Sequence, residues 1–490
     1  MKFRYIAFWS VGILLFSSCK KFLKEKPLTF LNTVTFYKNE ADLNSALYAL
    51  YQAQNTYYDG EAYAEMFWVI WELPSDQSYP NEGAGVSDNL KIDNYNFDPE
   101  IKYYDRWWRT AYKIISRSND VIKNVPGMPI SDEKKNLAIA EARFLRGQAY
   151  FELVMGWGDV PLVDETTVEF FPVRNSATEV YAFVIEDLKF ASQYLPALWP
   201  DNEYGRATKF AAKSYLAKLY LTMAGFPIQD QSKYALAAQE AKEVVDQGPY
   251  SLYPDVADNW DPTVSPMEQI YIVDKTRAAG NGSYFDSYWA PRNKNELAAE
   301  AGVNLVGAFL PNEDFYAEYP DDDPRKKKFF MTEVTSFMDP SLTLTLDQVT
   351  VRKYWTPLYS NGNDQDLVRL RLAEILLIQA EAENEVNGPT TQAYDALNAV
   401  RSRAYGDASH NYAGLSKDQF REAVWLERAL ELCFEGVRWS DMVRTRKYKG
   451  SSVFDYINAA GVSPLEKNLL FPISTPEMST NENLVQNQGY

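Results

Sequence analysis

The chain has 490 residues, of which 46% are hydrophobic, so it is long enough to bury a large core. Its formal net charge of −18 argues against nucleic acid and anionic lipid as partners. His410 is the only histidine, which excludes multi-histidine zinc sites and, away from that position, Ser-His-Asp and Cys-His catalysis. We therefore expect an acidic globular protein without a cofactor or a metal site.

The first residues have the pattern of a signal peptide, which we assign to residues 1–18. A basic start precedes an apolar run over residues 6–16, which is too short to span a bilayer core of roughly 30 Å. Two serines then precede Cys19, similar to a lipobox, so we predict cleavage before Cys19 and acylation of its sulfur. Ordinary secretory cleavage beside an incidental cysteine is the alternative. Residues 19–36 would form a lipidated tether.

Amphipathic segments with small residues beside large ones follow along the chain. Small residues allow a second helix to approach, and large ones fill its grooves, so the pattern predicts stacked helical pairs. The predicted helices are 40–57, 104–125, 133–157, 207–224, 234–247, 367–387, 392–404 and 419–435. They do not repeat at a strict 34-residue period. The fold class we predict is mostly all-α: a degenerate tetratricopeptide-type helical-pair scaffold with long irregular loop insertions.

We expect a single domain over residues 37–490. Its helical scaffold would lie mainly in 37–249 and 367–447, with a loop-rich insertion at 250–366 on the ligand side and a C-terminal extension at 448–490. Five tryptophans fall in helical patterns and are predicted to be core residues. They are Trp68, Trp71, Trp107, Trp108 and Trp157.

The segment 427–447 places many charges close together. Glu427, Glu431 and Glu435 are four residues apart, so on a helix they line one stripe. Three arginines follow, and we predict that they pair with these carboxylates in a buried structural network without catalytic chemistry. The arginines are Arg438, Arg444 and Arg446. Cys433 lies on the neighbouring apolar stripe and is expected to be a buried small hydrophobe.

Several sequence blocks resemble SusD/RagB-type proteins, which are nutrient-binding lipoproteins of the Bacteroidetes outer membrane. In chain order, the blocks are residues 142–147, 156–162, 205–208, 368–383, 393–403, 434–444, 470–473 and 486–490. Ser474 and Gln488 stand where the ending of the family has prolines. The resemblance implies an outer-membrane protein that faces the cell exterior, is anchored by lipid at Cys19, and has a SusC-type TonB-dependent porin as its partner.

The resemblance also implies a ligand site built from two loop-rich regions, 72–101 and 250–366. Both regions mix aromatic rings with amides and acids, which suits a sugar because its ring has apolar faces and a rim of hydroxyls. The predicted ligand-contacting residues are Tyr79, Asn81, Tyr284, Tyr288, Trp289 and Arg292. An acidic run at 321–323 lacks the spacing of a calcium loop, and we expect it to form a solvated turn.

The sequence therefore predicts a surface lipoprotein, without catalytic residues, that captures an oligosaccharide and delivers it to the porin. Peptide cargo in the same role is the main alternative, because the loops do not distinguish the two ligands. A structural adaptor without a ligand and a surface glycosidase, which needs only two carboxylates, are the remaining alternatives.

Overall fold

The computed structural model describes residues 36–59, 66–81, 87–200, 203–280, 282–291, 306–335, 341–355 and 363–490. Two predicted functional residues, Cys19 and Arg292, lie outside the described residues, as does the signal peptide.

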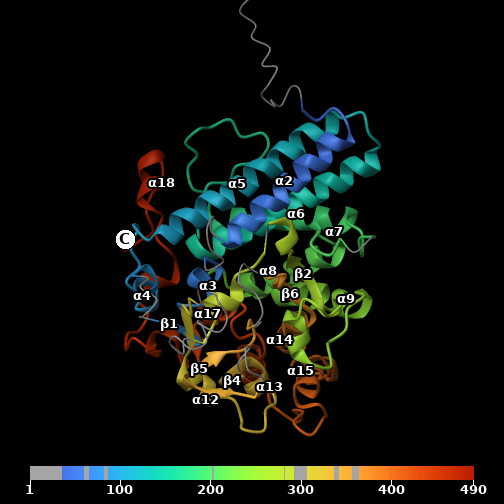
Figure 1. Cartoon of the computed structure of the whole chain (residues 1–490). Coiled ribbons are helices and arrows are strands. Elements are labelled where there is room, and N and C mark those ends of the chain that lie inside the picture. The colour runs from blue at the N-terminus through green and yellow to red at the C-terminus, as the bar shows by residue number, and fades with distance from the viewer. Residues whose placement is uncertain are drawn as a thin grey trace, which may run out of the picture.

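Stacked helices form the bulk of the molecule (Figure 1). The long helices are α2 (Glu40–Asp59), α5 (Lys102–Asn124), α6 (Asp132–Trp157), α7 (Ala177–Tyr194), α8 (Lys209–Ala224), α9 (Lys233–Gln247), α14 (Leu372–Asn387), α15 (Thr391–Tyr405) and α16 (Lys417–Glu431). Each helix from α5 to α9 packs against the next, and α9 then packs against α14. Residues 250–366 therefore interrupt the helical array in sequence, and the array resumes with α14. The predicted fold class is confirmed.

Local sequence signals explain where several helices begin. The side chains of Ser176 and Glu179 form a reciprocal capping box at the start of α7, and Ser416 and Gln419 do the same for α16. Ser131 caps α6 by accepting a hydrogen bond from the backbone N–H of Lys134. Each cap satisfies N–H groups that the first helical turn leaves without an intrahelical partner.

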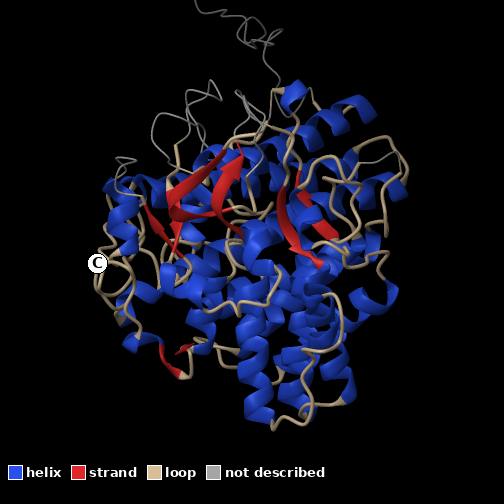
Figure 2. Ribbon diagram, turned by 60° about the horizontal axis from the view of Figure 1, so that its bottom comes forward, coloured by secondary structure: helices blue, strands red, loops and turns tan. Residues whose placement is uncertain are grey.

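Within the described residues, eight short strands form four pairs, mostly within the insertion and next to it in sequence, and Figure 2 shows strands against the helical bulk. The antiparallel pairs are β1 (Ser78–Pro80) with β3 (Phe309–Pro311), β2 (Gln269–Val273) with β6 (Leu367–Arg371), β4 (Phe330–Thr335) with β5 (Thr343–Val351), and β7 (Lys447–Tyr448) with β8 (Ser451–Ser452). The predicted helix over 367–387 was wrong at its start, because its first five residues form β6 and α14 begins at Leu372.

Short helices complete the fold. They are α3 (Met66–Trp71), α4 (Ser87–Asp93), α10 (Phe285–Tyr288), α12 (Glu313–Ala317), α13 (Arg325–Phe329), α17 (Arg438–Thr445) and α18 (Thr475–Thr480). All five tryptophans predicted as core residues are buried, as is Cys433. Within the described part of the chain, no helix combines the length and the apolar character needed to cross a membrane.

The carboxylates of Glu427, Glu431 and Glu435 are buried together, although α16 ends at Glu431 and Glu435 lies in the turn that follows. Arg371 donates to both Glu431 and Glu435, at 2.6 and 2.7 Å, and Arg325 donates to Glu427 and Glu431. The predicted buried structural network is therefore present.

The predicted cationic partners of this network were wrong. Arg438 pairs with Asp76, Arg444 with Glu381 and Asp441, and Arg446 with Glu466. The actual partners come from elements far away in sequence, which no helical spacing could reveal. They are Arg325, Lys353, Arg371, Arg401 and Arg403.

The acidic run at 321–323 is only partly solvated. Asp321 and Asp322 are exposed, as expected, but the side chain of Asp323 is buried and pairs with Arg325 at 2.8 Å. The expectation of a solvated turn was wrong for Asp323, because Arg325 of the same turn enters the core network and Asp323 neutralises part of its charge.

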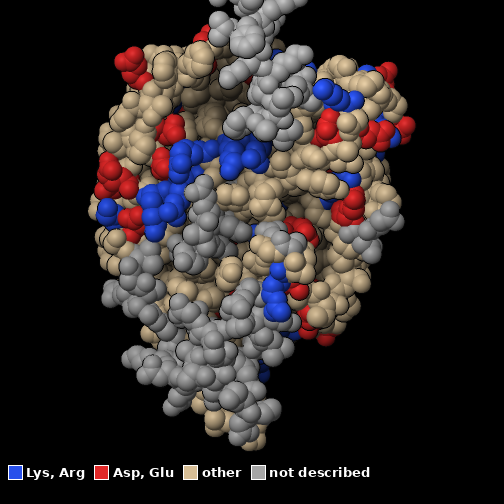
Figure 3. Space-filling view, turned by 45° about the horizontal axis from the view of Figure 1, so that its top comes forward, with Lys and Arg blue, Asp and Glu red and all other residues tan. Residues whose placement is uncertain are grey.

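Positive charge is unevenly distributed on this acidic protein. Figure 3 shows a band of Lys and Arg side chains across the face on which the N-terminal helices lie. Of the N-terminal helices, α5 carries exposed or half-exposed Lys102, Arg106, Arg109 and Lys113, which follow one another at helical spacings of four, three and four. The net charge of the whole chain conceals this local concentration.

Candidate functional site

A groove of about 820 Å³ opens beside the β1–β3 pair. Its lining comes from β1, α4, β3, α12, β5 and the C-terminal extension. The lining residues are Tyr79, Pro80, Asn81, Leu90, Asp93, Asn94, Leu310, Asn312, Glu313, Asp314, Gln348, Ala459 and Ala460. Segments from across the chain thus converge on this groove, which suits a binding site on a rigid scaffold.

The pairing of β1 with β3 positions the two predicted residues of this region. Tyr79 lies opposite Leu310 in the register. The backbone N–H of Asn81 donates to the carbonyl of Ala308 at 2.8 Å, and that of Asn312 donates to the carbonyl of Gln77 at 2.9 Å. These bonds hold both ends of the short pair, so Tyr79 and Asn81 are fixed on one wall.

Side chains just before β1 bind this wall to α16, to α17 and to the turn between them. Asp76 accepts two hydrogen bonds from the guanidinium of Arg438, at 2.8 and 3.0 Å. The amide of Gln77 donates to the carbonyl of Ala429 and accepts from the backbone N–H of Phe434. All of these contacts are buried or part-buried, so the family-like block at 434–444 supports the groove from behind.

Asp93, at the end of α4, gives the groove a buried carboxyl group. Its side chain is only 4% exposed, and burial raises its pKa to about 7. Its Oδ1 atom has no hydrogen-bond partner within the described residues. A buried oxygen without a partner is costly, and a ligand hydroxyl could supply the missing bond.

The lining combines polar with apolar side chains and, in the part of the chain that the structure describes, contains no Lys or Arg. Amides are supplied by Asn81, Asn94, Asn312 and Gln348, and carboxylates by Asp93, Glu313 and Asp314. The ring of Tyr79 is half-buried. Burial is the main cause that raises the pKa of its hydroxyl, and the nearby Glu313 and Asp93 add to it, so the hydroxyl stays protonated. The groove is suited to a neutral, hydroxyl-rich ligand and not to an anion.

The structure separates the six predicted ligand-contacting residues. Tyr79 and Asn81 line the groove, and Tyr284 is 43% exposed but is not part of its lining. Tyr288 and Trp289 are buried, and the centre of the Trp289 ring lies 5.1 Å from the ring centres of Phe309 and Phe434. We therefore leave Tyr288 and Trp289 out of the proposed site. Aromatic rings scattered along a loop do not reveal which of them point inward.

Sequence reasoning did not single out the second wall of the groove. Asn312 caps α12 by accepting from the N–H of Asp314 at 2.9 Å, so the polar run after Pro311 did carry a helix-start signal. Gln348 had no such signal, because it belongs to a strand whose pairing brings it to the groove.

Two family models match the chain. The model described as "SusD family" matches residues 343–490, and the model described as "Starch-binding associating with outer membrane" matches residues 21–221. The matched segments include most of the helical array and leave much of the insertion unmatched. The unmatched part of the chain, between residues 221 and 343, includes Leu310, Asn312, Glu313 and Asp314 of the groove lining.

Relatives extend over nearly the whole chain. A SusD-like protein of Formosa agariphila is 28% identical, with 87% of each chain covered, and a second from that organism is 27% identical, with 96% of each covered. A SusD superfamily protein from Parabacteroides distasonis is 26% identical, with a TM-score of 0.81 over 91% of this chain and 99% of that structure. Together with the two family models, these relatives show that the chain is a SusD/RagB-type protein.

Proposed function

We propose that the protein binds an oligosaccharide in the groove beside β1 and β3 and delivers it to a SusC-type TonB-dependent transporter. The single observation that carries the binding step is the lining of the groove, in which the Tyr79 ring stands among amide and carboxylate groups. The ring can contact the apolar face of a sugar, and the polar groups can pair with its hydroxyls.

Two similar structures support glycan as the ligand class. A structure titled "Laminarin binding SusD-like protein" has a TM-score of 0.76 over 93% of this chain, and that whole chain, at 24% identity. A structure titled "Surface glycan-binding protein A from Bacteroides uniformis" has a TM-score of 0.78 over 92% of this chain and 99% of that one, at 22% identity. At these identities, the likeness shows the fold, and the ligand of this chain remains our proposal.

Peptide cargo is the competing ligand, and the groove restricts which peptides could bind. The described lining holds carboxylates but no Lys or Arg, so a peptide carboxylate would find no ionic partner there. Basic peptides are therefore the informative comparison. We propose a neutral glycan as the cargo. Tighter binding of Lys- or Arg-rich peptides than of any glycan would contradict this proposal.

We propose that the bound ligand undergoes no chemistry. The carboxylates of the groove make this worth testing, because the pKa of Asp93 is raised to about 7, as in general acids of glycosidases. Any glycan that binds is incubated with the protein and analysed for reducing ends. The expected result is no turnover, and release of sugar that is lost in Asp93→Asn would establish a hydrolase instead.

We further propose that acyl chains on Cys19 hold the protein at the outer membrane with the groove accessible from the cell exterior. One matching family model carries the description "associating with outer membrane", which supports the location. The transporter is proposed from the family, and co-purification of a large porin with the tagged protein from its native membrane would test it.

Calorimetry tests the binding step. The chain from residue 20 onward, which keeps every described residue, is titrated with plant, host and microbial glycans and with basic peptides. For a glycan that binds, Tyr79→Ala should weaken the affinity about tenfold or more, which corresponds to about 1.4 kcal/mol. Tyr194→Ala, a half-exposed tyrosine at the end of α7, is the matched control. Equal affinity of the Tyr79→Ala protein and the control would place the ligand elsewhere.

A further inference from the structure

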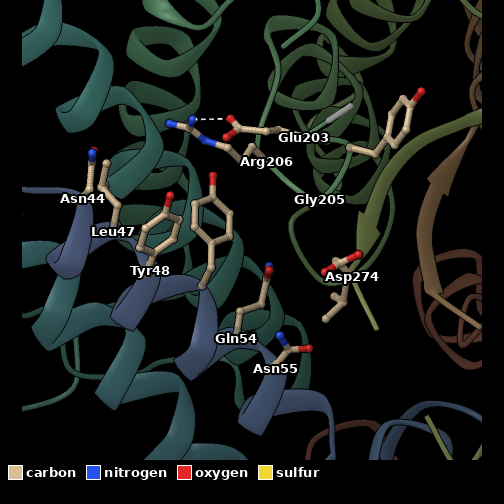
Figure 4. A pocket seen from close by; sticks show the side chains of 12 residues that line it. Asn44, Leu47, Tyr48, Gln54, Asn55, Glu203, Gly205, Arg206 and Asp274 are labelled. Atoms are coloured by element: carbon tan, nitrogen blue, oxygen red, sulfur yellow. Dashed lines mark hydrogen bonds and ion pairs between the residues drawn. The ribbon is translucent and has the colours of Figure 1, made fainter. Parts of the chain in front are cut away.

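A second, smaller pocket lies between α2 and the segment that precedes α8. Its volume is about 250 Å³, and it shares no lining residue with the groove. Figure 4 shows the side chains of Asn44, Tyr48 and Asn55 along α2 on one side and Glu203 and Arg206 on the other. The pocket is smaller than the roughly 300–1,000 Å³ of sites for drug-sized ligands, so it fits a single ring.

The rear of the pocket is held by a charged cluster. The guanidinium of Arg206 donates to the carboxylate of Glu141 at 2.6 and 3.0 Å and to that of Glu203 at 2.6 Å. It also lies 3.4 Å from the centre of the Trp199 ring. Tyr51, which belongs to the lining, donates to Glu141 at 2.8 Å. These contacts keep the wall in place without a ligand.

Gly205 allows the wall to close tightly. A Cβ atom at this position would lie 2.8 Å from the Cβ of Asp274, which is closer than side chains pack. The family-like block at 205–208 therefore brings Asp274 against the segment that carries Glu203 and Tyr204. Any larger residue would move one wall of the pocket.

Two tyrosine rings stand at this pocket on facing segments. Tyr48 is 67% exposed and Tyr204 is 48% exposed. An exposed ring is common on a protein surface, but two rings in the lining of one concave pocket give it apolar surface from two different segments. Flat apolar planes of this kind suit the C–H faces of a sugar ring.

The polar groups of the pocket match a neutral ligand. Asn55 belongs to the lining, and its buried Oδ1 atom has no hydrogen-bond partner within the described residues, so a small movement of the side chain would let it accept from a ligand hydroxyl. Asn44 and Asp274 supply further amide and carboxylate groups. Arg206, the one Lys or Arg in the described lining, already donates to two carboxylates, so an anionic ligand would gain little from it.

From this arrangement, we infer that the pocket is a second carbohydrate site, which takes one neutral sugar residue between Tyr48 and Tyr204. It does not depend on the groove being a glycan site. If the groove and the pocket bind units of the same polysaccharide, the second binding event is intramolecular. The overall affinity then rises although neither site gains a contact.

The test uses the chain from residue 20 onward with Tyr79→Ala and Asn81→Ala, so that the groove contributes nothing. Saturation-transfer NMR is recorded with maltose, laminaribiose, mannobiose and lactose at millimolar concentration, and separately with spermidine. At least one sugar should give transfer, Tyr48→Ala should reduce it at least fivefold, and Tyr48→Phe should retain it. Asn55→Ala should also reduce it, and Tyr194→Ala should not. Thermal melting verifies that each variant is folded.

The inference is overturned by absence of transfer from every sugar in the groove variant, by unchanged transfer in Tyr48→Ala, or by transfer from spermidine alone. The last result would show a site for organic cations, which Glu203 and Asp274 would then bind. The two proposals fail separately. If Tyr79→Ala leaves calorimetric binding unchanged while Tyr48→Ala removes it, the groove proposal falls and the pocket stands.

Discussion

At the scale of single residues, buried charges determine much of the behaviour of this protein. Burial pushes the pKa of Glu431 upward, but the guanidinium groups of Arg403, Arg371 and Arg325 outweigh burial and hold the pKa below its ordinary value. A lowered carboxyl pKa contributes stability that is present above the pKa of the unfolded chain and is lost as the pH falls through the folded pKa. The network therefore favours the folded state at neutral pH and weakens in acid.

Removing one cation from this network should be severely destabilising. Arg371 is 1% exposed and donates to Glu268, Glu431 and Glu435. In Arg371→Met, these carboxylates lose a buried partner, and breaking a buried pair in this way costs about 3–5 kcal/mol. Urea unfolding measures the loss. Lys134→Ala, which breaks an exposed pair with Glu40, should cost no more than about 1 kcal/mol, and equal losses would contradict the account.

Glu72 should have the opposite effect to Glu431 on the pH dependence of stability. Burial raises its pKa to about 8, so between the ordinary glutamate pKa and pH 8 the folded state holds a proton that the unfolded state has released. The free energy of unfolding should then fall as the pH rises, by at most about 1.4 kcal/mol per pH unit. Glu72→Gln removes this titration, so its stability relative to the wild type should improve from pH 5 to pH 8 in urea unfolding. A constant difference would contradict the raised pKa.

At the scale of elements, the turn between α16 and α17 connects the helical array to the groove. The backbone N–H of Gly436 donates to Glu72 at 3.0 Å, and the carbonyl of Phe434 accepts from Trp68 at 2.9 Å. Gln77, just before β1, accepts from Phe434 of the same turn and donates to Ala429 of α16, so these contacts hold the segment that leads into β1. A change in this turn should therefore reach the groove.

Gly436→Ala tests this connection. Gly436 has a φ of +68°, and a methyl group there would overlap the ring of Phe67. We expect a loss of stability well beyond the roughly 1–2 kcal/mol of left-handed strain alone, together with weaker ligand binding in the groove. Gly406→Ala is the matched control, because its φ is +85° and the space around it is open. Thermal melting and calorimetry measure both effects, and equal losses in the two variants would contradict the connection.

The helices could be predicted from the sequence because their signals are local, whereas the pairings between strands could not be predicted. α5, α6 and α9 begin and end within about two residues of their predictions, since the periodicity of each helix lies within its own segment. β6 was absorbed into the helix that follows it, because its pairing with β2 depends on residues about 100 positions away. Tyr79 was predicted from its loop, whereas Gln348 needed the fold to bring it near.

At the scale of the whole molecule, the two family models together match most of the array of helices, and the insertion supplies a wall of the groove. The two proposed sites lie on different supports. The groove depends on β1, β3 and α12, and the pocket on α2, the segment before α8 and Asp274, which follows β2. Both sites therefore take part of their lining from the insertion, so a change in the insertion could alter either one.

The same scale decides what holds the protein at a membrane. If Cys19 is acylated, the wild type should sediment with the outer membrane and Cys19→Ala should not, because buried acyl chains supply the attachment. The basic band on the N-terminal face offers a competing explanation, since it could contact anionic groups of a membrane surface (Figure 3). Electrostatic attachment weakens in salt, whereas acyl anchoring does not. The lipid is the anchor if the wild type stays in the membrane fraction in 1 M salt and Cys19→Ala is soluble even at low salt. Release of the wild type by salt would instead assign the attachment to the basic band.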